Sequence, residues 1–439
     1  MGPRFRWWTS IESVGEIIMI NRLIKLLNQC GLDGYLINQE NRETYQLFFV
    51  KDQIETVRGG SFTEAEITVY LNHDGFLGDS KFKVFASSSD EEIIATIKEA
   101  KAKALSINNK PYNLVAKDIL EDDNHDDRSL KEIAKDISNA IFSVKGHERS
   151  KLNATEVFVN RINKRVVNSL GLDKSSHSYK FMIETIPTYD SNNESVEIYA
   201  QHNFSIFSRK EIEEYIAEKL FEVEARGNVK KEKLPANMNV LLREEEVETV
   251  LSEFVYQLTY SSLFNQRNAL NVGDKVQEEG DCDLLTLTMR GNIEGCSESA
   301  LFDNDGSSFK DKVIIDKGVV KGFYGGNRFS QYVGQENTGS LELSELALGT
   351  LSKDGLKNEE YLECLQFSGI QCDYLNDYVG GEVRLAIWHK NGQKIPVSGF
   401  SISASLKEML NHARLANYDV HSPSYHGPKF IYFRNMNVL

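Results

Sequence analysis

Two short turn sequences constrain the fold of the second half of the chain more than any other feature. The first is residues 316–318 (Asp-Lys-Gly), and the second is residues 391–392 (Asn-Gly). Each lies between two strand-like runs. The first turn separates Val313–Ile315 from Val319–Phe323, and the second separates Val383–Trp388 from Lys394–Val397. Because such glycine-containing turns join antiparallel strands, both sequences predict a β-hairpin. The second half is therefore expected to be rich in antiparallel strands.

The first half mixes helical and strand patterns. Apolar residues recur at helical spacing from Ile20 to Leu27, whereas residues 65–71 alternate between apolar and polar side chains. Two Ser-x-x-Glu sequences, starting at Ser89 and Ser208, have the spacing of a helix capping box. Further strands are expected at Glu156–Val167, Tyr179–Thr185 and Val196–Phe207, with an exposed acidic loop at Leu120–Arg128. The order of helix, antiparallel strands and helix predicts an α+β unit.

One linker candidate suggests two domains. Residues 227–235 (GNVKKEKLP) are charged, bounded by helix breakers and without hydrophobic periodicity. We predict the α+β class, with an N-terminal α+β domain of antiparallel strands at 19–226 and a C-terminal β-rich domain with a few helices at 236–439. Residues 1–18 are interpreted as an N-terminal extension, with Met19 as the natural start.

Charge and cysteine content narrow the functional classes. The 439 residues include 50 Lys and Arg and 65 Asp and Glu, a net charge of −15. Such a surface repels phosphate backbones and anionic membranes, and no apolar stretch approaches the roughly 20 residues of a membrane-spanning helix. The five cysteines are scattered and form no Cys-x-x-Cys pair. We therefore expect a cytoplasmic protein that binds neither nucleic acid nor membrane.

Standard catalytic and metal-binding motifs are missing. The sequence has no P-loop, dinucleotide fingerprint, nucleophile elbow or H-E-x-x-H. Residues 303–306 (Asp-Asn-Asp-Gly) start like a calcium loop but lack its terminal glutamate, so a turn is the better interpretation. His412, His421 and His426 would need to converge with a fourth ligand to hold a metal, and surface histidines are the default interpretation. We expect no metal, no cofactor and no catalytic residue.

Several features, in their order along the chain, resemble the TldD/PmbA family, whose members were once called modulators of DNA gyrase. The segments that carry the resemblance are Leu301–Gly306, similar to the family's FDDEG turn; Ile315–Gly322, similar to its I-x-x-G-x-L-K-G hairpin; Thr338–Ser340, at its TGN position; and residues 391–410, similar to its NG…PV…ISGN stretch and the following LLELL helix. The resemblance spans about residues 20–435.

The family has two kinds of member. TldD-like chains resemble zinc peptidases that carry H-E-x-x-x-H on a helix and a distal cysteine. In that arrangement the two histidines bind Zn²⁺ and the glutamate polarises the attacking water. TldE/PmbA-like chains lack these ligands and pair with a TldD-like subunit.

The resemblance places the zinc motif of this chain at Ser252–Gln257, counted back from Gly273. Glu253 keeps the glutamate position, while Ser252 and Gln257 stand where the histidines should be. The sequence has no histidine between positions 202 and 389 and no cysteine after position 372. A hydroxyl and an amide do not replace two imidazoles as zinc ligands. The alternative interpretation of Glu253 is a solvated glutamate on a helix whose apolar residues face the core.

The resemblance implies a non-catalytic TldE/PmbA-like subunit of a TldD/TldE-type metallopeptidase, acting in proteolysis or maturation of unfolded peptides. It would complete a cavity that admits an extended peptide to the zinc of a TldD-like partner. Two alternatives stay open: a stand-alone, homodimeric binding protein for peptides or proteins, and a metallopeptidase built on His412, His421 and His426. We also expect a large C-terminal interface, because the strands near 313–323 and 383–388 carry many apolar side chains, including Phe323, Tyr324 and Trp388.

Overall fold

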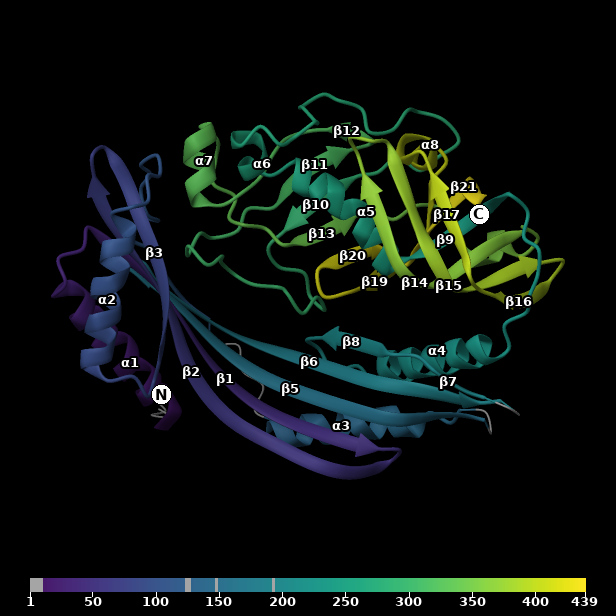
Figure 1. The fold of residues 1–439 in the computed structure, drawn as a ribbon, viewed down its shortest axis with the longest axis horizontal. Coiled ribbons are helices and arrows are strands. Elements are labelled where there is room, and N and C mark those ends of the chain that lie inside the picture. Colours follow the sequence, from purple (N-terminus) through teal and green to yellow (C-terminus); the bar gives the residue numbers. More distant parts are fainter. Residues whose placement is uncertain (1–10, 123–127, 147–148, 192–193) are drawn as a thin grey trace, which may run out of the picture.

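The computed structural model describes residues 11–122, 128–146, 149–191 and 194–439, with only the backbone for 11–18 (Figure 1). Part of the predicted extension at 1–18 lies outside these residues, and helix α1 (Ile11–Asn28) begins ahead of Met19. Much of the predicted acidic loop at 120–128 also lies outside them. No helix in the described part of the chain is long and apolar enough to cross a membrane.

A long, curved and mostly antiparallel sheet forms the N-terminal lobe, which comprises the described residues up to 227 (Figure 1). Its strand order is β3-β2-β1-β5-β6-β4, and β7 and β8 also pair with β6. The strands are β1 (Gly34–Val50), β2 (Gln53–His73), β3 (Phe76–Phe85), β4 (Ile119–Glu121), β5 (Ser150–Asn168), β6 (Asp173–Asp190), β7 (Ser195–Glu197) and β8 (Ala200–Phe204).

Helices cover the two ends of this sheet. At one end α1 and α2 (Asp90–Ala104) bury Ile, Leu and Val side chains against β1 and β2. At the other end α3 (Leu130–Ser143) and α4 (Arg209–Gly227) contact each other and pack against β5 and β6. The capping box predicted at Ser89 is confirmed, since Ser89 N donates to Glu92 Oε2 (2.8 Å) and Glu92 N donates to Ser89 Oγ (3.2 Å). Sequence reasoning missed α3, although Ser129 begins the same motif there.

Two sheets and several helices form the C-terminal lobe, residues 237–439. The strand orders are β12-β11-β10-β13-β20-β19 and β14-β9-β21-β17-β15-β16, and β18 pairs with β21. The strands are β9 (Asn237–Arg243), β10 (Leu287–Arg290), β11 (Lys312–Asp316), β12 (Val319–Val320), β13 (Leu343–Leu346), β14 (Tyr361–Asp373), β15 (Tyr378–Lys390), β16 (Gln393–Val397), β17 (Phe400–Ala404), β18 (Arg414–Leu415), β19 (Asp419–His421), β20 (Tyr425–Pro428) and β21 (Phe430–Val438). The helices are α5 (Glu244–Gln257), α6 (Tyr260–Phe264), α7 (Asn327–Val333), α8 (Leu406–Leu410) and the 3₁₀ turn η1 (Lys353–Leu356).

Both predicted hairpins are confirmed. Lys317 and Gly318 join β11 to β12 with φ values of 47° and 74°, and Asn391 and Gly392 join β15 to β16 with 52° and 74°. Two consecutive residues with positive φ are typical of the tight hairpin turn that favours Asn-Gly. The predicted fold class is likewise confirmed: the chain is α+β, with a strand-rich C-terminal lobe. Residues 228–236 run between α4 and β9 without helix or strand.

The C-terminal aromatic residues do not support the expected interface. Tyr324 is 4% exposed and Trp388 is 3% exposed, and both belong to the core between the two C-terminal sheets. Phe323 packs against the same core. One sheet face alone would not bury all of these apolar side chains. Two sheets pack against each other here, and together they bury them. These residues are therefore internal, and a partner surface has to be sought elsewhere.

Segment 301–308 of the C-terminal lobe fixes it to the N-terminal sheet, which curves beneath that lobe in Figure 1. Phe302 is 1% exposed and packs with Leu36, Val166 and Leu172 of the N-terminal lobe. The buried ammonium of Lys174 lies 2.7 Å from Ser308 Oγ. The lobes are thus joined by the buried Phe302 side chain, called the plug below, and by polar contacts around it.

Candidate functional site

The predicted zinc-motif position lies in the last turns of α5. Ser252 is exposed and donates its hydroxyl proton to the Thr249 carbonyl oxygen at 2.7 Å. Gln257 is 2% exposed; its amide nitrogen donates to Glu253 Oε1 at 3.0 Å, and its amide oxygen accepts from Ala269 N at 2.6 Å. Gln257 therefore connects the helix to the following loop. Its amide oxygen, the atom that could bind a metal, already accepts the hydrogen bond from Ala269 N.

Zinc does not fit this position. A small pocket there brings Cys372 near Glu253. Burial, followed by the charges of Glu253 and Asp373, raises the pKa of the Cys372 thiol to about 12. One carboxylate and one thiol do not make the three or four strong ligands of a zinc site.

A buried charge network, which sequence reasoning missed, surrounds Arg243 at the start of α5. Its guanidinium contacts Glu218 and Glu222 of α4, the latter at 2.8 Å, and lies 3.4 Å from Glu363 of β14. His389 Nε2 lies 2.8 Å from the other oxygen of Glu363. Although burial opposes ionisation, the His389 hydrogen bond and the nearby Lys353 and Arg243 charges hold the pKa of Glu363 below its usual range. The network connects the helix of one lobe to the sheet of the other.

Glu246, one turn along α5, is buried and forms no ion pair with any residue that the structure describes. It is 8% exposed, and burial, followed by the charge of Glu245, raises its pKa from 4.5 to about 8. Between about pH 5 and pH 8 the folded chain therefore keeps a proton that the unfolded chain releases, so the free energy of unfolding falls as pH rises.

Replacing Glu246 by glutamine should remove this pH dependence, because glutamine does not ionise. Relative to the wild type, Glu246→Gln should gain up to about 1.4 kcal/mol of stability per pH unit across that window. Urea unfolding at several pH values from about 5 to 8 measures the difference. A difference between the two proteins that stays constant with pH would contradict the assignment.

Glu248 links α5 to the β19–β20 hairpin. Its carboxylate accepts hydrogen bonds from Ser422 Oγ (3.0 Å) and from Ser424 Oγ. Arg243, Glu244 and Glu248 also have the spacing of the first, second and last residues of H-E-x-x-x-H. This second register of the motif begins at the last residue of β9, and its Glu248 contacts a distal C-terminal segment.

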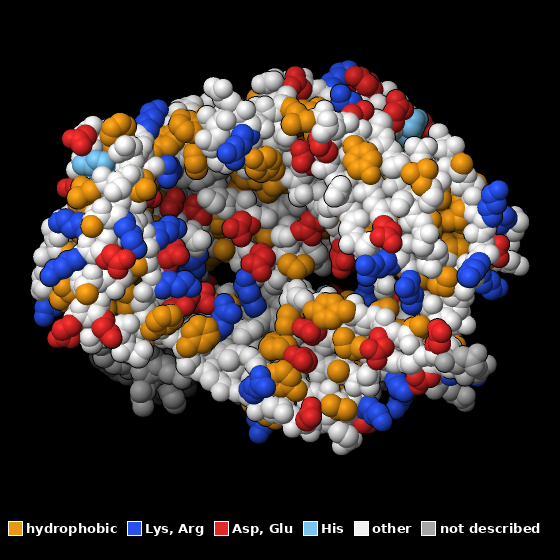
Figure 2. Space-filling model, in the orientation of Figure 1, with side chains coloured by type: hydrophobic (Ala, Val, Ile, Leu, Met, Phe, Trp, Pro, Cys, Tyr) orange, Lys and Arg blue, Asp and Glu red, His pale blue; other side chains and the backbone are white. Residues whose placement is uncertain are grey.

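A cavity of about 840 Å³ lies between the lobes. Figure 2 shows the molecule hollowed there, with acidic and basic side chains gathered around the hollow. The lining comes from both lobes: β1, β2, β5 and β6 on one side, and residues 291–305 on the other. Among its charged groups, Lys164 has a pKa lowered by burial, and Asp305 has a pKa raised to about 6 by burial and by Asp303. The cavity is thus lined by acidic and basic side chains together with polar neutral ones.

Residues 303–306 form a turn, as predicted, and its leading carboxylate is fully used inside the protein. Asp303 Oδ1 accepts from the backbone N–H groups of Asp305 and Ser307, and Oδ2 accepts from that of Ser340, each at 2.9 Å. Gly306 has φ +83°, and a Cβ there would lie 2.2 Å from the Leu172 side chain. The turn thus fixes the position of Phe302 between the lobes. The Asp303 carboxylate is already hydrogen-bonded to the backbone and does not form a calcium site.

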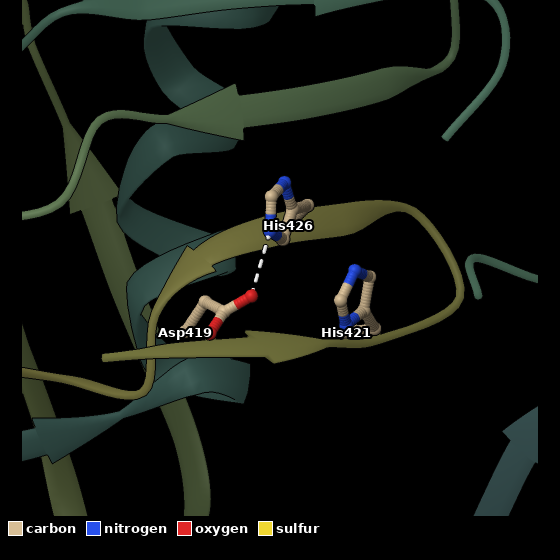
Figure 3. Close-up of side chains that lie close together, drawn as sticks. All are labelled: Asp419, His421 and His426. Carbon is tan, nitrogen blue, oxygen red and sulfur yellow. Dashed lines mark hydrogen bonds and ion pairs between the residues drawn. The ribbon is translucent and has the colours of Figure 1, made fainter. Parts of the chain in front are cut away.

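The structure brings together two of the three C-terminal histidines. His421 of β19 and His426 of β20 are cross-strand partners with stacked rings 4.4 Å apart. Asp419, which sequence reasoning overlooked, completes a group whose ligand atoms all lie within 4.8 Å of one another (Figure 3). His412 follows α8 and is not part of this group.

Comparison with known proteins identifies relatives of this fold. Residues 235–439 match the family model of the PmbA/TldA metallopeptidase C-terminal domain. Over 260 residues the chain is 23% identical to an uncharacterized protein of Methanocaldococcus jannaschii, a match that covers 57% of this chain and 60% of that protein. The chain thus aligns with less than two thirds of this curated relative.

Three solved structures share the fold over almost the whole chain. TldE of Thermococcus kodakarensis has a TM-score of 0.76 at 16% identity, covering 95% of this chain and 99% of its own. A proposed DNA gyrase modulator of Bacteroides thetaiotaomicron has a TM-score of 0.76 at 16% identity, covering 98% and 99%. Another, of Thermotoga maritima, has a TM-score of 0.73 at 16% identity, covering 97% and 100%.

These findings assign residues 235–439 to the PmbA/TldA metallopeptidase C-terminal domain family, and they show that the chain as a whole has the fold of TldE.

Proposed function

We propose that this chain is the non-catalytic, TldE/PmbA-like subunit of a TldD/TldE-type metallopeptidase. The observation that carries the proposal is the sequence of residues 243–257, which form α5 and its N-cap. In one register of the motif Ser252 and Gln257 occupy the histidine positions, and in the other Arg243 and Glu248 do. A permanently charged guanidinium repels a metal cation, and Gln257 is engaged inside the chain. Neither register supplies the two imidazoles of a zinc peptidase.

In such a subunit the cavity would bind part of the peptide substrate. It is lined by both lobes and carries side-chain amides, hydroxyls and charges of both signs. Amides such as those of Asn292 and Asn304 can donate to and accept from a peptide backbone. The chemistry at zinc belongs to the TldD-like partner, and this chain holds part of the extended peptide. All five cysteines are free thiols, which suits the reducing cytoplasm that we propose as its location.

A surface beside the degenerate motif is the best candidate for contact with that partner. Tyr256 and Leu375 line the small pocket that also contains Glu253, and they are 49% and 70% exposed. Large apolar side chains at the centre of an interface contribute much of the binding energy.

The assembly is tested by light scattering on the chain, a TldD-like subunit carrying H-E-x-x-x-H, and their mixture. We expect a stable complex that Leu375→Asp weakens at least about tenfold, because the substitution would bury a charge. Leu170→Asp is the matched control, since Leu170 is 52% exposed on the other lobe. A mixture in which both chains stay apart would contradict the proposal, and a chain that pairs only with itself would favour the stand-alone binding protein.

A further inference from the structure

We propose that Asp419, His421 and His426 form a site for a divalent transition metal, with Zn²⁺ as the best match. The site lies on the β19–β20 hairpin and uses no residue of either motif register, although Glu248 of the second register contacts the turn of this hairpin through Ser422 and Ser424. This inference does not rest on the proposed function, and it replaces the expectation that the C-terminal histidines are only surface residues.

The hairpin itself places the three side chains together. His421 and His426 are direct partners across an antiparallel pair, and Asp419 is two residues before His421 on the same strand. Because side chains alternate between the faces of a strand, all three lie on one face, as Figure 3 shows. The opposite face is the core side, where Val420 and Tyr425 pack. The cluster is thus fixed by the strand register.

The distances suit a metal after a small adjustment. Asp419 Oδ2 lies 3.0 Å from His426 Nε2, and the ligand atoms of all three residues lie within 4.8 Å of one another. Bonds of about 2.0–2.2 Å in a tetrahedral site place ligand atoms about 3.3 Å apart. Closing the remaining gap requires the stacked His421 ring to rotate about its side-chain bonds, and no described residue makes a hydrogen bond to this ring.

Surrounding residues support a cation there. Glu345 of β13, the strand beside β20, lies 3.3 Å from His426 Nδ1 and so can orient the ring with Nε2 towards Asp419. A carboxylate on the second nitrogen of a histidine ligand is the usual way in which proteins orient and strengthen it. Glu211 and Glu294 also lie near His421 and add negative charge.

The ligand types select the class of metal. Two imidazoles and a carboxylate suit Zn²⁺, Co²⁺ and Ni²⁺ better than Mg²⁺ or Ca²⁺, which prefer oxygen ligands. Three protein ligands leave a fourth position of zinc for water or another oxygen. His421 and Asp419 are exposed, so a metal can enter from solvent. A Cβ built on Gly295 would lie 3.2 Å from the His421 ring, and Gly295 also lines the cavity between the lobes.

Equilibrium dialysis of the full chain alone against micromolar ZnCl₂, followed by elemental counting, tests the site. We expect about one zinc per wild-type chain, and binding at least about tenfold weaker after His421→Ala, His426→Ala or Asp419→Asn. His412→Ala is the matched control and should bind as the wild type does. Zinc should also raise the Tm of the wild type and of His412→Ala, but not of His421→Ala.

Three outcomes would overturn the site: no saturable zinc on the wild-type chain, zinc that His421→Ala and His426→Ala both retain, or equal loss in His412→Ala. Asp419→Asn guards against misfolding, because it keeps the size of the side chain and changes only its charge. Circular dichroism of each variant confirms that the fold is kept.

Discussion

Replacing Arg243 by alanine is expected to lower the free energy of unfolding by about 3–5 kcal/mol. The guanidinium contacts Glu218, Glu222 and Glu363, of which Glu222 is 1% exposed. Alanine would leave these buried carboxylates near one another without their common cation. Most of this loss in stability comes from leaving charged carboxylates buried without a cation. That cost is larger than the net stabilisation that the ion pairs give to the intact protein. Urea unfolding of wild type and variant at neutral pH measures it.

Arg434→Ala is the matched control for this experiment. Arg434 also pairs with a carboxylate, Asp281 Oδ2 at 2.6 Å, but both side chains are largely exposed to water. Exposed ion pairs contribute little, because water solvates the charges when the pair is broken. Equal destabilisation by the two substitutions would show that burial of the Arg243 network is not what stabilises the fold.

Phe302→Ala is expected to destabilise the chain by about 3–5 kcal/mol. Phe302 is 1% exposed, and its ring enters a cluster formed mostly by the N-terminal lobe, including Leu36, Val166 and Leu172. Its removal leaves a cavity where the two lobes meet, in a turn that Asp303 keeps rigid. The loss should appear in urea unfolding, together with faster proteolysis between the lobes, since the plug holds them together.

Phe85→Ala applies the same substitution to a ring that is 51% exposed at the end of β3. Its effect should stay within about 0.5 kcal/mol, the range of ordinary surface substitutions. If Phe302→Ala were as mild as this control, the turn at 301–308 would not be the contact that joins the lobes.

Local signals in the sequence predicted local structure well. Positive φ at Asn391 and Gly392, and the capping box at Ser89, each depend on a few neighbouring residues, so their patterns could be recognised without the fold. The missed helix α3 carried the same signal at Ser129. It could have been found from the sequence, and it was obscured by the acidic stretch before it.

The arrangement of the candidate sites could not be predicted in the same way. Arg243 meets Glu218 on α4 and Glu363 on β14, residues far apart in the sequence that only the packing of the two lobes brings together. Trp388 looked available to a partner because its strand was considered as part of a single sheet, whereas a second sheet buries it. Tertiary packing decides such contacts, and no local pattern records it.

The histidine cluster lies between these two cases. His421 and His426 were recognised as neighbours in sequence, but pairing them requires the register of the β19–β20 hairpin, and Asp419 enters only with that register. The alternation Asp419, Val420, His421 was the available signal, since it places an acidic residue and a histidine on one face of a strand. A hairpin predicted at residues 419–428 would have found the group.

The central claim is that the zinc chemistry belongs to a partner and not to this chain, and cleavage of an unfolded peptide tests it most directly. With zinc present, the chain alone should leave the peptide intact, and adding a TldD-like subunit should produce cleavage. Glu253→Gln in this chain should leave that rate unchanged, whereas the same change in the partner's H-E-x-x-x-H should abolish it, because only that glutamate faces a metal-bound water. Cleavage by the isolated chain that Glu253→Gln removes would contradict the account.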